Sequence, residues 1–440
     1  MEISTLYERY LACGGVVTTD SRTLKGGELF FALKGENFDG NAYALKALEA
    51  GARYAVVSED SEAARSGRDD VIAVPDTLEA LQALARHHRN AVRPEGRRLT
   101  VIGLTGTNGK TTTKELIRTV LATRYTLTAT EGNLNNDIGV PLTLLKINDA
   151  TQLAVVEMGA NHPDDIAHLV RVCEPDLGLI TNVGRAHLLG FGSFEGVKRA
   201  KGQLYDWIAS HGGEVFLNTD DADLCGMVAE RPGLSILPYG LTHAGAGVLP
   251  SSPDEPFLRI RMGQRVIKTQ LVGAYNAANV MAALAVGARF GVPVADAAAA
   301  IAAYVPANNR SQMTRTERNT IIVDAYNANP SSMRAALDNF AAVQAPSKIA
   351  LLGDMRELGD DSLQEHCAIV RKALSADFRP VFVGEEFRKA LQELKPDPTP
   401  AWFADSAALA AWLKENPVSG AVVLVKGSRG IKMENTIPEL

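Results

Sequence analysis

Residues 101–112 carry the side chains whose types and spacing are best suited to chemistry. They read VIGLTGTNGKTT, an apolar run that passes through a glycine-rich turn into Gly-Lys-Thr. Glycines let backbone N–H groups point at phosphate oxygens, and the first turn of a helix attracts anions. A lysine there reaches the β- and γ-phosphates, and the next threonine offers a hydroxyl to Mg²⁺. The stretch predicts an ATP-binding phosphate loop formed by Gly106, Thr107, Asn108, Gly109, Lys110, Thr111 and Thr112.

The spacing of this loop departs from the common pattern GxxxxGK[ST]. Leu104 stands where the first glycine is expected, and Gly106 takes its place closer to the lysine. A glycine-rich turn without a ligand is one alternative, but the apolar run before it and the lysine after it favour phosphate. A dinucleotide site is a poorer fit, because a lysine at the helix start suits phosphate charge better than a nicotinamide.

Two further polar side chains follow apolar runs in the same part of the chain. Glu157 ends the run 153–157, and His187 comes shortly after the run 177–183. If both runs are parallel strands, their carboxyl ends meet at the sheet edge that also holds the phosphate loop. A carboxylate oxygen suits Mg²⁺, and a neutral imidazole can ligate a metal. Taken alone, each residue is better explained as an ordinary polar residue at a strand end.

The elements that must position these side chains alternate between strands and helices. In the middle of the chain we expect strands at 99–104, 153–157 and 177–183, with helices at about 110, 164–171 and 194–210. This alternation predicts a mostly parallel sheet covered by helices. Residues 258–271 alternate apolar and polar types around Met-Gly-Gln, which predicts a β-hairpin.

The flanking segments predict two further α/β domains. The first contains expected strands at 28–32, 53–57 and 71–74 and helices at 43–50 and 77–93, and the third contains strands at 320–323, 349–352, 381–383 and 422–425. A polar stretch with Pro and Gly at 93–98 and another near 306–309 mark the boundaries. The predicted domains are 1–96, 97–308 and 309–440, the last a doubly wound, Rossmann-like unit.

Composition narrows the class of protein. With 46% hydrophobic and 22% charged residues, no apolar run of about 20 and no signal peptide, we expect a cytoplasmic globular protein without membrane insertion. The net charge of −6 gives no reason to expect nucleic acid as a partner. The scattered Cys13, Cys173, Cys225 and Cys367 predict buried reduced thiols, and the lack of a coiled-coil seam predicts a monomer.

The form of the phosphate loop resembles the Mur ligase family, the ATP-dependent amide ligases of peptidoglycan synthesis. Matching motifs spread the resemblance over nearly the whole chain: residues 19–22, 31–40, 131–136, 157–160, 182–187, 324–330, 352–355 and 426–429. The first two resemble a uridine-binding domain. Residues 326–330, 353–355 and 357–359 resemble the branch that adds D-alanyl-D-alanine to UDP-N-acetylmuramoyl-tripeptide. After Asp39-Gly40 the family often has His, whereas this chain has Asn41.

The resemblance implies a reaction and a set of site residues. ATP would phosphorylate the tripeptide carboxylate, and the dipeptide amine would attack the acyl phosphate to give the amide, ADP and phosphate. Lys110, Glu157, His187 and Lys201 would be catalytic, and Thr111, Glu157, His187 and Lys201 would hold two Mg²⁺ ions, with Lys201 carbamylated. Further ATP contacts would come from Asn279, Arg310 and Asp324. Substrate contacts would come from Ser21, Arg22, Asn135, Tyr326, Asn329, Lys426 and Arg429.

Three alternatives stay open at this point. The first two are other ligases of the same kind, MurE-like or folylpolyglutamate synthetase-like, and the third is a non-catalytic ATP-binding protein. The uridine-domain motifs argue against the folate reading. The presence of Lys110, Glu157 and Lys201 argues against a protein that has lost catalysis.

Overall fold

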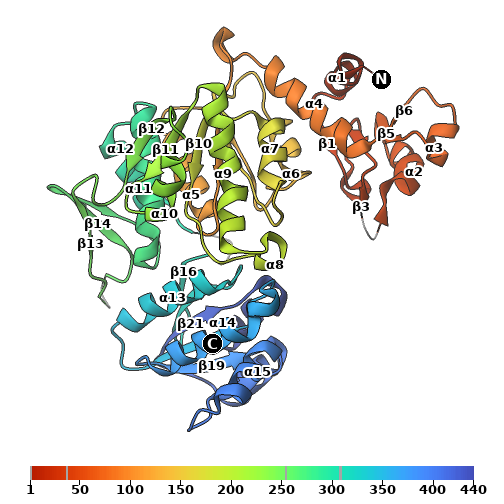
Figure 1. The fold of residues 1–440 in the computed structure, drawn as a ribbon. Coiled ribbons are helices and arrows are strands. Elements are labelled where there is room, and N and C mark those ends of the chain that lie inside the picture. The colour runs from red at the N-terminus through yellow and green to blue at the C-terminus, as the bar shows by residue number, and fades with distance from the viewer. Residues whose placement is uncertain (1, 36–37, 253–254, 307–309) are drawn as a thin grey trace.

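The computed structural model describes residues 2–35, 38–252, 255–306 and 310–440, and it divides into three α/β domains (Figure 1). The predicted fold class is confirmed. Two predicted features fall partly outside the described residues: positions 36–37 of the motif at 31–40, and positions 307–309 of the second boundary. The domain boundaries after residues 96 and 308 stay predictions.

The N-terminal domain is built on a four-stranded parallel sheet of order β1-β2-β5-β6. Leu29, Phe30 and Phe31 of β2 are all buried, as expected for a parallel strand covered on both faces. The elements of this domain are α1 (Ile3–Ala12), β1 (Val17–Thr18), β2 (Leu29–Phe31), β3 (Lys34–Gly35), β4 (Phe38–Asp39), α2 (Ala44–Glu49), β5 (Tyr54–Ser58), α3 (Glu62–Arg65), β6 (Val71–Val74) and α4 (Thr77–Ala91).

The central domain carries a six-stranded parallel sheet of order β12-β11-β10-β7-β9-β8. A separate three-stranded antiparallel sheet, β13-β14-β15, follows it. The elements are β7 (Thr100–Thr105), α5 (Lys110–Leu121), β8 (Leu127–Ala129), α6 (Gly139–Leu144), β9 (Leu153–Glu157), α7 (Asp165–Cys173), β10 (Leu177–Ile180), α8 (Leu188–Phe191), α9 (Phe194–His211), β11 (Glu214–Asn218), α10 (Ala222–Ala229), β12 (Ser235–Tyr239), β13 (Ala246–Leu249), β14 (Arg259–Met262), β15 (Arg265–Lys268), α11 (Ala277–Arg289) and α12 (Val294–Ala303).

The C-terminal domain has a six-stranded sheet of order β16-β17-β21-β18-β19-β20, in which only β16 is antiparallel to its neighbour. Its elements are β16 (Gln312–Arg315), β17 (Thr320–Asp324), α13 (Pro330–Ala342), β18 (Lys348–Gly353), α14 (Ser362–Leu374), β19 (Arg379–Val383), α15 (Glu385–Leu394), β20 (Ala401–Phe403), α16 (Ser406–Glu415) and β21 (Val422–Lys426). In Figure 1 this domain lies next to α8 of the central domain and away from the N-terminal domain.

Most predicted strands and helices are confirmed within two residues, but three expectations need correction. The strand expected at 177–183 ends at Ile180, because Thr181 and Asn182 turn away to bond the phosphate loop. The predicted hairpin is confirmed, yet the sequence missed its third strand, β13. Cys225 is only partly buried, while the other three cysteines are buried free thiols.

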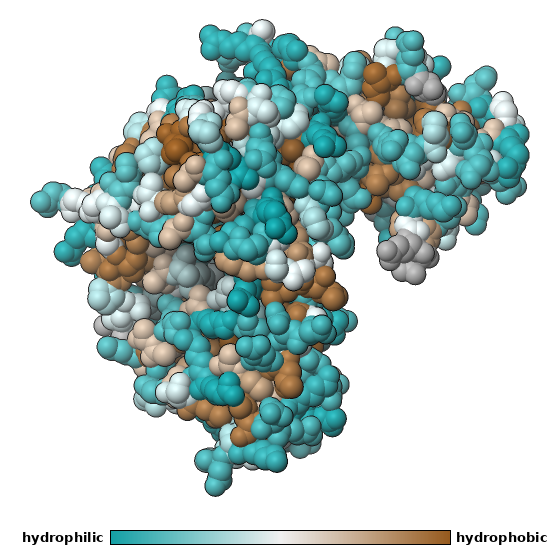
Figure 2. All heavy atoms as spheres, viewed as in Figure 1, coloured by the Kyte–Doolittle hydropathy of each residue, from teal (hydrophilic) through white to brown (hydrophobic). Residues whose placement is uncertain are grey.

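The visible surface of the protein is mostly hydrophilic. Figure 2 shows hydrophilic side chains over most of the visible face, and its outline is open between the N-terminal and C-terminal domains. In the described ranges we find no helix with the length and apolar character of a membrane span.

Candidate active site

The phosphate loop lies at the centre of the central sheet's carboxyl edge. It follows β7, which lies between β9 and β10. Glu157 ends β9, and Thr181 and Asn182 follow β10. Parallel pairing of these three strands therefore brings residues from distant parts of the chain to one edge, where α/β sheets bind their ligands.

Close packing around the loop explains its glycines. Gly106 and Gly109 have φ of 148° and 77°, in the region that favours glycine. A Cβ on Gly106 would collide with Thr181 Oγ1, and one on Gly109 would lie 2.7 Å from Asn279 Oδ1. The Asn182 side chain fixes the loop, since its Oδ1 accepts from Asn108 N and its Nδ2 donates to Asn108 O, both at 3.0 Å. The loop is held open for an anion by its neighbours.

Lys110 begins α5 and folds back over the loop. Its Nζ donates to Gly106 O at 2.7 Å and to Thr107 O at 3.3 Å. Burial lowers the pKa of Lys110, and the Glu157 carboxylate opposes that shift. Backbone carbonyls are weak partners for an ammonium, so a triphosphate would be a better one.

Glu157 offers an oxygen that the protein does not use. Its Oε1 accepts from Thr111 Oγ1 at 3.1 Å and from Asn135 Nδ2 at 2.9 Å. Its Oε2 is buried and has no hydrogen-bond partner among the described residues. Thr130 holds the backbone of this carboxylate, because its Oγ1 accepts from Glu157 N at 2.9 Å. A buried, unpartnered carboxylate oxygen beside a threonine hydroxyl fits a Mg²⁺ ion.

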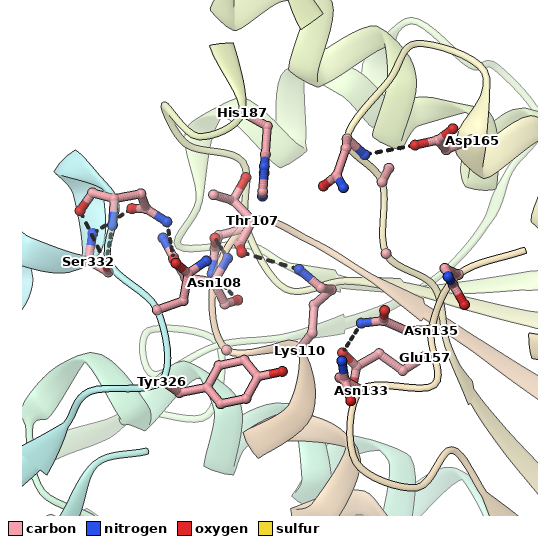
Figure 3. A pocket seen from close by; sticks show the side chains of 18 of the residues that line it. Thr107, Asn108, Lys110, Asn133, Asn135, Glu157, Asp165, His187, Tyr326 and Ser332 are labelled. Atoms are coloured by element: carbon pink, nitrogen blue, oxygen red, sulfur yellow. Dashed lines mark hydrogen bonds between the residues drawn. The ribbon is translucent and has the colours of Figure 1, made fainter. Parts of the chain in front are cut away.

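His187 and Lys201 supply nitrogen on the other side of Lys110. Figure 3 shows Lys110 between His187 and Glu157. Burial lowers the pKa of His187, Glu357 of the C-terminal domain raises it, and the charges of Lys110 and Lys201 lower it further. Burial also lowers the pKa of Lys201 well below its usual value, and the nearby Lys110 adds to this shift. The charged ammonium form of Lys201 is therefore disfavoured. Only an uncharged or modified Lys201 could ligate a metal, because an ammonium has no lone pair to donate.

The C-terminal domain contributes cationic side chains to the same site. The Arg310 guanidinium lies 3.7 Å from the centroid of the Tyr326 ring, and that of Arg429 lies 5.4 Å away. Lys426 Nζ pairs with Asp324 Oδ2 at 2.5 Å, as expected from the direct register of β17 and β21.

A cavity of about 1050 Å³ lies between these groups, and residues of all three domains line it. The N-terminal domain contributes Asp76, Leu78, Glu79 and Gln82. The volume is at the upper end of the range for small-molecule sites, which suits a nucleotide together with part of a second substrate. In the described part of the chain no three His, Cys, Asp or Glu side chains cluster as a metal site, so phosphate and water would have to complete any Mg²⁺ shell.

Comparison with known proteins agrees with this arrangement. Three family models match the chain: the Mur ligase family catalytic domain over residues 15–89, the Mur ligase middle domain over 104–287 and the Mur ligase glutamate ligase domain over 309–429. The UDP-N-acetylmuramoyl-tripeptide--D-alanyl-D-alanine ligase of Bacillus subtilis is 34% identical over 99% of this chain and 94% of its own length. The chain belongs to the Mur ligase family.

Solved structures of Mur ligases show the same fold over the full length. MurF of Acinetobacter baumannii has a TM-score of 0.84 at 29% identity and covers 98% of this chain and 97% of its own. MurF ligase of Thermotoga maritima, solved in complex with ADP, has a TM-score of 0.79 at 26% identity, with 96% of each chain covered.

Most side chains that the Mur ligase resemblance singled out lie on the cavity. They are Thr107, Asn108, Gly109, Lys110, Thr112, Asn135, Glu157, His187, Asn279, Arg310, Asp324, Tyr326, Asn329 and Lys426. Gly106, Thr111, Lys201 and Arg429 are not among the lining residues, and Arg429 Nη1 donates to the Tyr326 hydroxyl at 3.4 Å. Ser21 and Arg22 are not brought to it; Arg22 is exposed and pairs with Asp20 at 2.7 Å.

Sequence reasoning gave no role to several residues that the structure places at the site. Thr181 and Asn182 hold the phosphate loop, and Thr130 holds Glu157. Asn182 lies in a quoted motif and directly follows a strand next to β7, so its position was a usable signal. Glu357 also lies in a quoted motif, but its contact with His187 depends on how two domains meet.

Proposed function

We propose that this Mur ligase catalyses the ATP-dependent joining of D-alanyl-D-alanine to UDP-N-acetylmuramoyl-tripeptide, releasing ADP and phosphate. Full-length similarity to a D-alanyl-D-alanine ligase is the observation that carries this proposal. The cavity supports it, because residues of three domains surround the phosphate loop. The MurE-like, folylpolyglutamate synthetase-like and non-catalytic alternatives have no comparable support at this identity and coverage.

The reaction has two steps, each of which gathers negative charge. A carboxylate oxygen of the tripeptide first attacks the γ-phosphorus of ATP, the bond to the β-γ bridging oxygen breaks, and ADP leaves. The amine of the dipeptide then attacks the acyl carbon, loses a proton, and phosphate leaves. Lys110 would exchange its carbonyl partners for phosphate oxygens, and the loop N–H groups would hold the triphosphate. Asn279, Arg310 and Asp324 would complete the ATP site.

Thr111 and Glu157 are suited to hold a first Mg²⁺ ion, and His187 and a modified Lys201 a second. Bound there, Mg²⁺ supplies positive charge that offsets the charge developing on the transferring phosphoryl group. The oxygen at Glu157 Oε2 is available for this purpose without breaking a protein hydrogen bond.

Lys201 is suited to carbamylation. Its side chain is 2% exposed, and burial and Lys110 together hold its pKa well below the usual value, which favours the neutral amine. The amine nitrogen would attack the carbon of CO₂ and lose a proton, which gives an anionic carbamate. That product replaces a buried cation by an oxygen ligand and offsets the charge of Lys110.

Substrate contacts are proposed on all three domains. Ser21 and Arg22 would contact the uridine diphosphate, with Arg22 exchanging Asp20 for a phosphate. Asn135, Tyr326, Asn329, Lys426 and Arg429 would contact the peptide parts. The monomeric state and the cytoplasmic location stay predictions.

Omission of single substrates tests the reaction. Phosphate release from ATP is measured with UDP-N-acetylmuramoyl-tripeptide and D-alanyl-D-alanine together, and then with each left out. We expect release only when both are present. Release with a free amino acid in place of the dipeptide would point to a different ligase, and no release in any combination would favour an ATP-binding protein.

A matched pair of lysines tests the carbamate. Lys198 lies one turn before Lys201 on α9 but pairs with Glu195 and Asp223 at the surface. We expect Lys201→Ala to lose most activity, to regain part of it with short carboxylates, and to lose a carbamate signal in ¹³C NMR with labelled bicarbonate. Lys198→Ala should keep both activity and signal. Wild-type activity in Lys201→Ala would rule the carbamate out.

A further inference from the structure

The segment 353–359 contains motif residues that have no role in the reaction described above. It connects β18 to the short helix η5 (Gly359–Asp361) of the C-terminal domain. Glu357 extends from this segment across the domain junction, where its Oε2 pairs with Nδ1 of His187. Next to this contact, Gly359 lies against Leu189, so close that an added Cβ would be 3.3 Å from Leu189 Cδ1. The segment is therefore part of the contact between the two domains.

His187 and Glu357 both have a backbone conformation that residues with a side chain rarely adopt. The φ angles are 52° at His187 and 64° at Glu357. Such a conformation costs roughly 1 kcal/mol or more for each residue and persists only where the surroundings enforce it. Because two such residues face each other across the junction, we infer that the surrounding structure fixes the directions of both side chains.

The segment that carries Glu357 is fixed from behind. The Asp354 carboxylate accepts from Glu386 N at 3.0 Å and Phe387 N at 2.9 Å, at the start of α15. Met355 N donates to His366 Nε2 at 3.1 Å, and Ser428 Oγ donates to Asp354 O at 2.6 Å. Because these bonds anchor the segment inside its domain, Glu357 moves with the C-terminal domain as a unit.

The imidazole of His187 has two nitrogens with different surroundings. Nδ1 faces Glu357, which in a neutral ring makes Nδ1 the hydrogen-bearing nitrogen and leaves the lone pair on Nε2. A carboxylate that accepts from one ring nitrogen fixes the orientation of the ring and makes the other nitrogen a better ligand. His187 lines the cavity, and in Figure 3 its ring points toward Thr107 and Lys110.

We propose that Glu357 is a positioning residue that prepares His187 for the nucleotide-bound metal ion only when the C-terminal domain is docked. The inference rests on the proposed function, because it needs a metal–nucleotide complex in the cavity. In this view docking does more than deliver Arg310 and Tyr326 to the site. It also selects one tautomer and one orientation of an imidazole in the neighbouring domain.

Three variants of the full chain test the role. Glu357→Ala removes the acceptor, Glu357→Gln keeps an acceptor oxygen of the same reach, and Glu385→Gln removes a charge from an exposed side chain of α15 that pairs with Arg388. The first readout is the imidazole ¹⁵N spectrum, with the His187 signals assigned by His187→Gln. The second is binding of Mn²⁺ in the presence of ADP, followed by electron paramagnetic resonance.

We expect Glu357→Ala to lose the Nδ1–H signature of His187, to weaken Mn²⁺ binding about 10- to 100-fold and to lower kcat more than it raises KM for ATP. Glu357→Gln should keep the signature and most of the Mn²⁺ affinity, and Glu385→Gln should match the wild type. An unchanged His187 spectrum and unchanged Mn²⁺ binding in Glu357→Ala would overturn the proposal.

The failure of this inference is distinguishable from failure of the proposed function. The spectrum of His187 and the Mn²⁺ titration do not require turnover. If the wild type releases no phosphate with both substrates, the ligase assignment fails, whereas the response of His187 to Glu357→Ala still decides the role of the pair. If the wild type ligates normally and the His187 spectrum is unaffected in Glu357→Ala, only the role proposed for Glu357 is rejected, and the proposed function stands.

Discussion

The two junctions of the central domain are built in different ways. At the N-terminal junction a single apolar core continues from one domain into the other: Leu6 and Tyr10 belong to the same buried cluster as Val140, Leu144 and Ile166. At the C-terminal junction the cores are separate, and Val272 is the one buried residue described for the central domain that joins the C-terminal cluster. Burial of apolar area resists separation, whereas polar contacts can be exchanged for water.

The polar contacts differ in the same sense. Arg89 of α4 is fully buried and donates to Cys173 O, Glu174 O and Asp176 across the N-terminal junction. Polar contacts at the C-terminal junction include that of His187 with Glu357 and that of Asn329 Nδ2, which donates to Asn108 Oδ1 at 2.8 Å. Ser311 of the C-terminal domain adds hydrogen bonds to Val272, Tyr275 and Asn276. From these contacts we expect the first junction to resist separation more strongly than the second. Opening at the second junction would suit a site that must admit three substrates and then exclude water.

The largest effect is expected from breaking the buried contacts of the N-terminal junction. Arg89→Met leaves two buried carbonyls and part of the Asp176 carboxylate without their partner, so we expect the free energy of unfolding to fall by about 3 kcal/mol. Urea denaturation at fixed protein concentration measures it. The unfolding slope should also show whether the N-terminal domain now separates as its own unit.

Arg98 provides the matched control for this prediction. Its guanidinium also pairs with Asp176, at 2.7 Å, but its side chain is 53% exposed. Arg98→Gln should therefore cost less than about 1 kcal/mol. Similar losses in the two variants would mean that the buried interdomain contacts of Arg89 contribute no more than an exposed ion pair, and the contrast between the junctions would disappear.

A smaller effect, on activity and not on stability, is expected at the C-terminal junction. Asn329→Ser keeps a residue that can cap α13 but removes the amide that reaches Asn108. Loss of one interdomain hydrogen bond of about 1 kcal/mol predicts a roughly fivefold lower kcat/KM for ligation. Steady-state phosphate release measures it, with small-angle scattering to report whether the ATP-bound enzyme becomes more open.

The control for Asn329 is a helix cap far from the site. The Asp405 carboxylate accepts from Ala408 N at 2.8 Å at the start of α16. Asp405→Ala should lower the free energy of unfolding by about 1 kcal/mol and leave kcat/KM unchanged. A loss of stability without loss of activity in Asn329→Ser would reduce Asn329 to a cap.

The comparison of the two junctions also shows which features the sequence could predict: those that lie within one domain. The phosphate loop, Glu157 and most strand bounds follow from local patterns, since a glycine turn and an apolar run impose their geometry on the nearest residues. The arrangement of Glu157 next to Thr111 follows from parallel pairing of β7 with β9, which α/β alternation implies. This part of the site lies within one domain, where local structure and sheet order suffice.

Contacts across domains were beyond the sequence. Asn329 was expected to bind substrate, but in the structure its amide caps α13 and contacts Asn108, so the substrate role stays a prediction. Lys426 was likewise expected to contact substrate; its Nζ pairs with Asp324 of the same domain, and its substrate role also stays a prediction. The role of Glu357 depends on which face of the C-terminal domain meets the central one. No periodicity or spacing encodes that rigid-body placement.

The smallest effect is expected from a single proton at the N-terminal junction. His88 of α4 is buried beside Tyr7 and Tyr10, and its Nε2 lies 2.7 Å from Ile147 O of the central domain. Burial lowers the pKa of His88, with His87 in the same direction and the Ile147 carbonyl and Asp149 opposing it. The imidazole therefore stays neutral in the folded protein at a pH where it is already protonated in the unfolded chain.

The sign follows from proton uptake. Below the unfolded pKa of about 6.5, the unfolded chain binds more protons than the folded protein, so the free energy of unfolding falls as pH falls. Above that pH the imidazole is neutral in both states, and this loss of stability is absent. His187 and His366 have pKa values lowered in the same direction and add to this slope. Denaturation at pH 7.5 and 5.5 should therefore show a smaller difference for His88→Gln than for wild type. If the difference in free energy of unfolding between the two pH values is the same in His88→Gln and wild type, His88 is protonated in the folded protein at low pH. The N-terminal junction would then contain a buried charge.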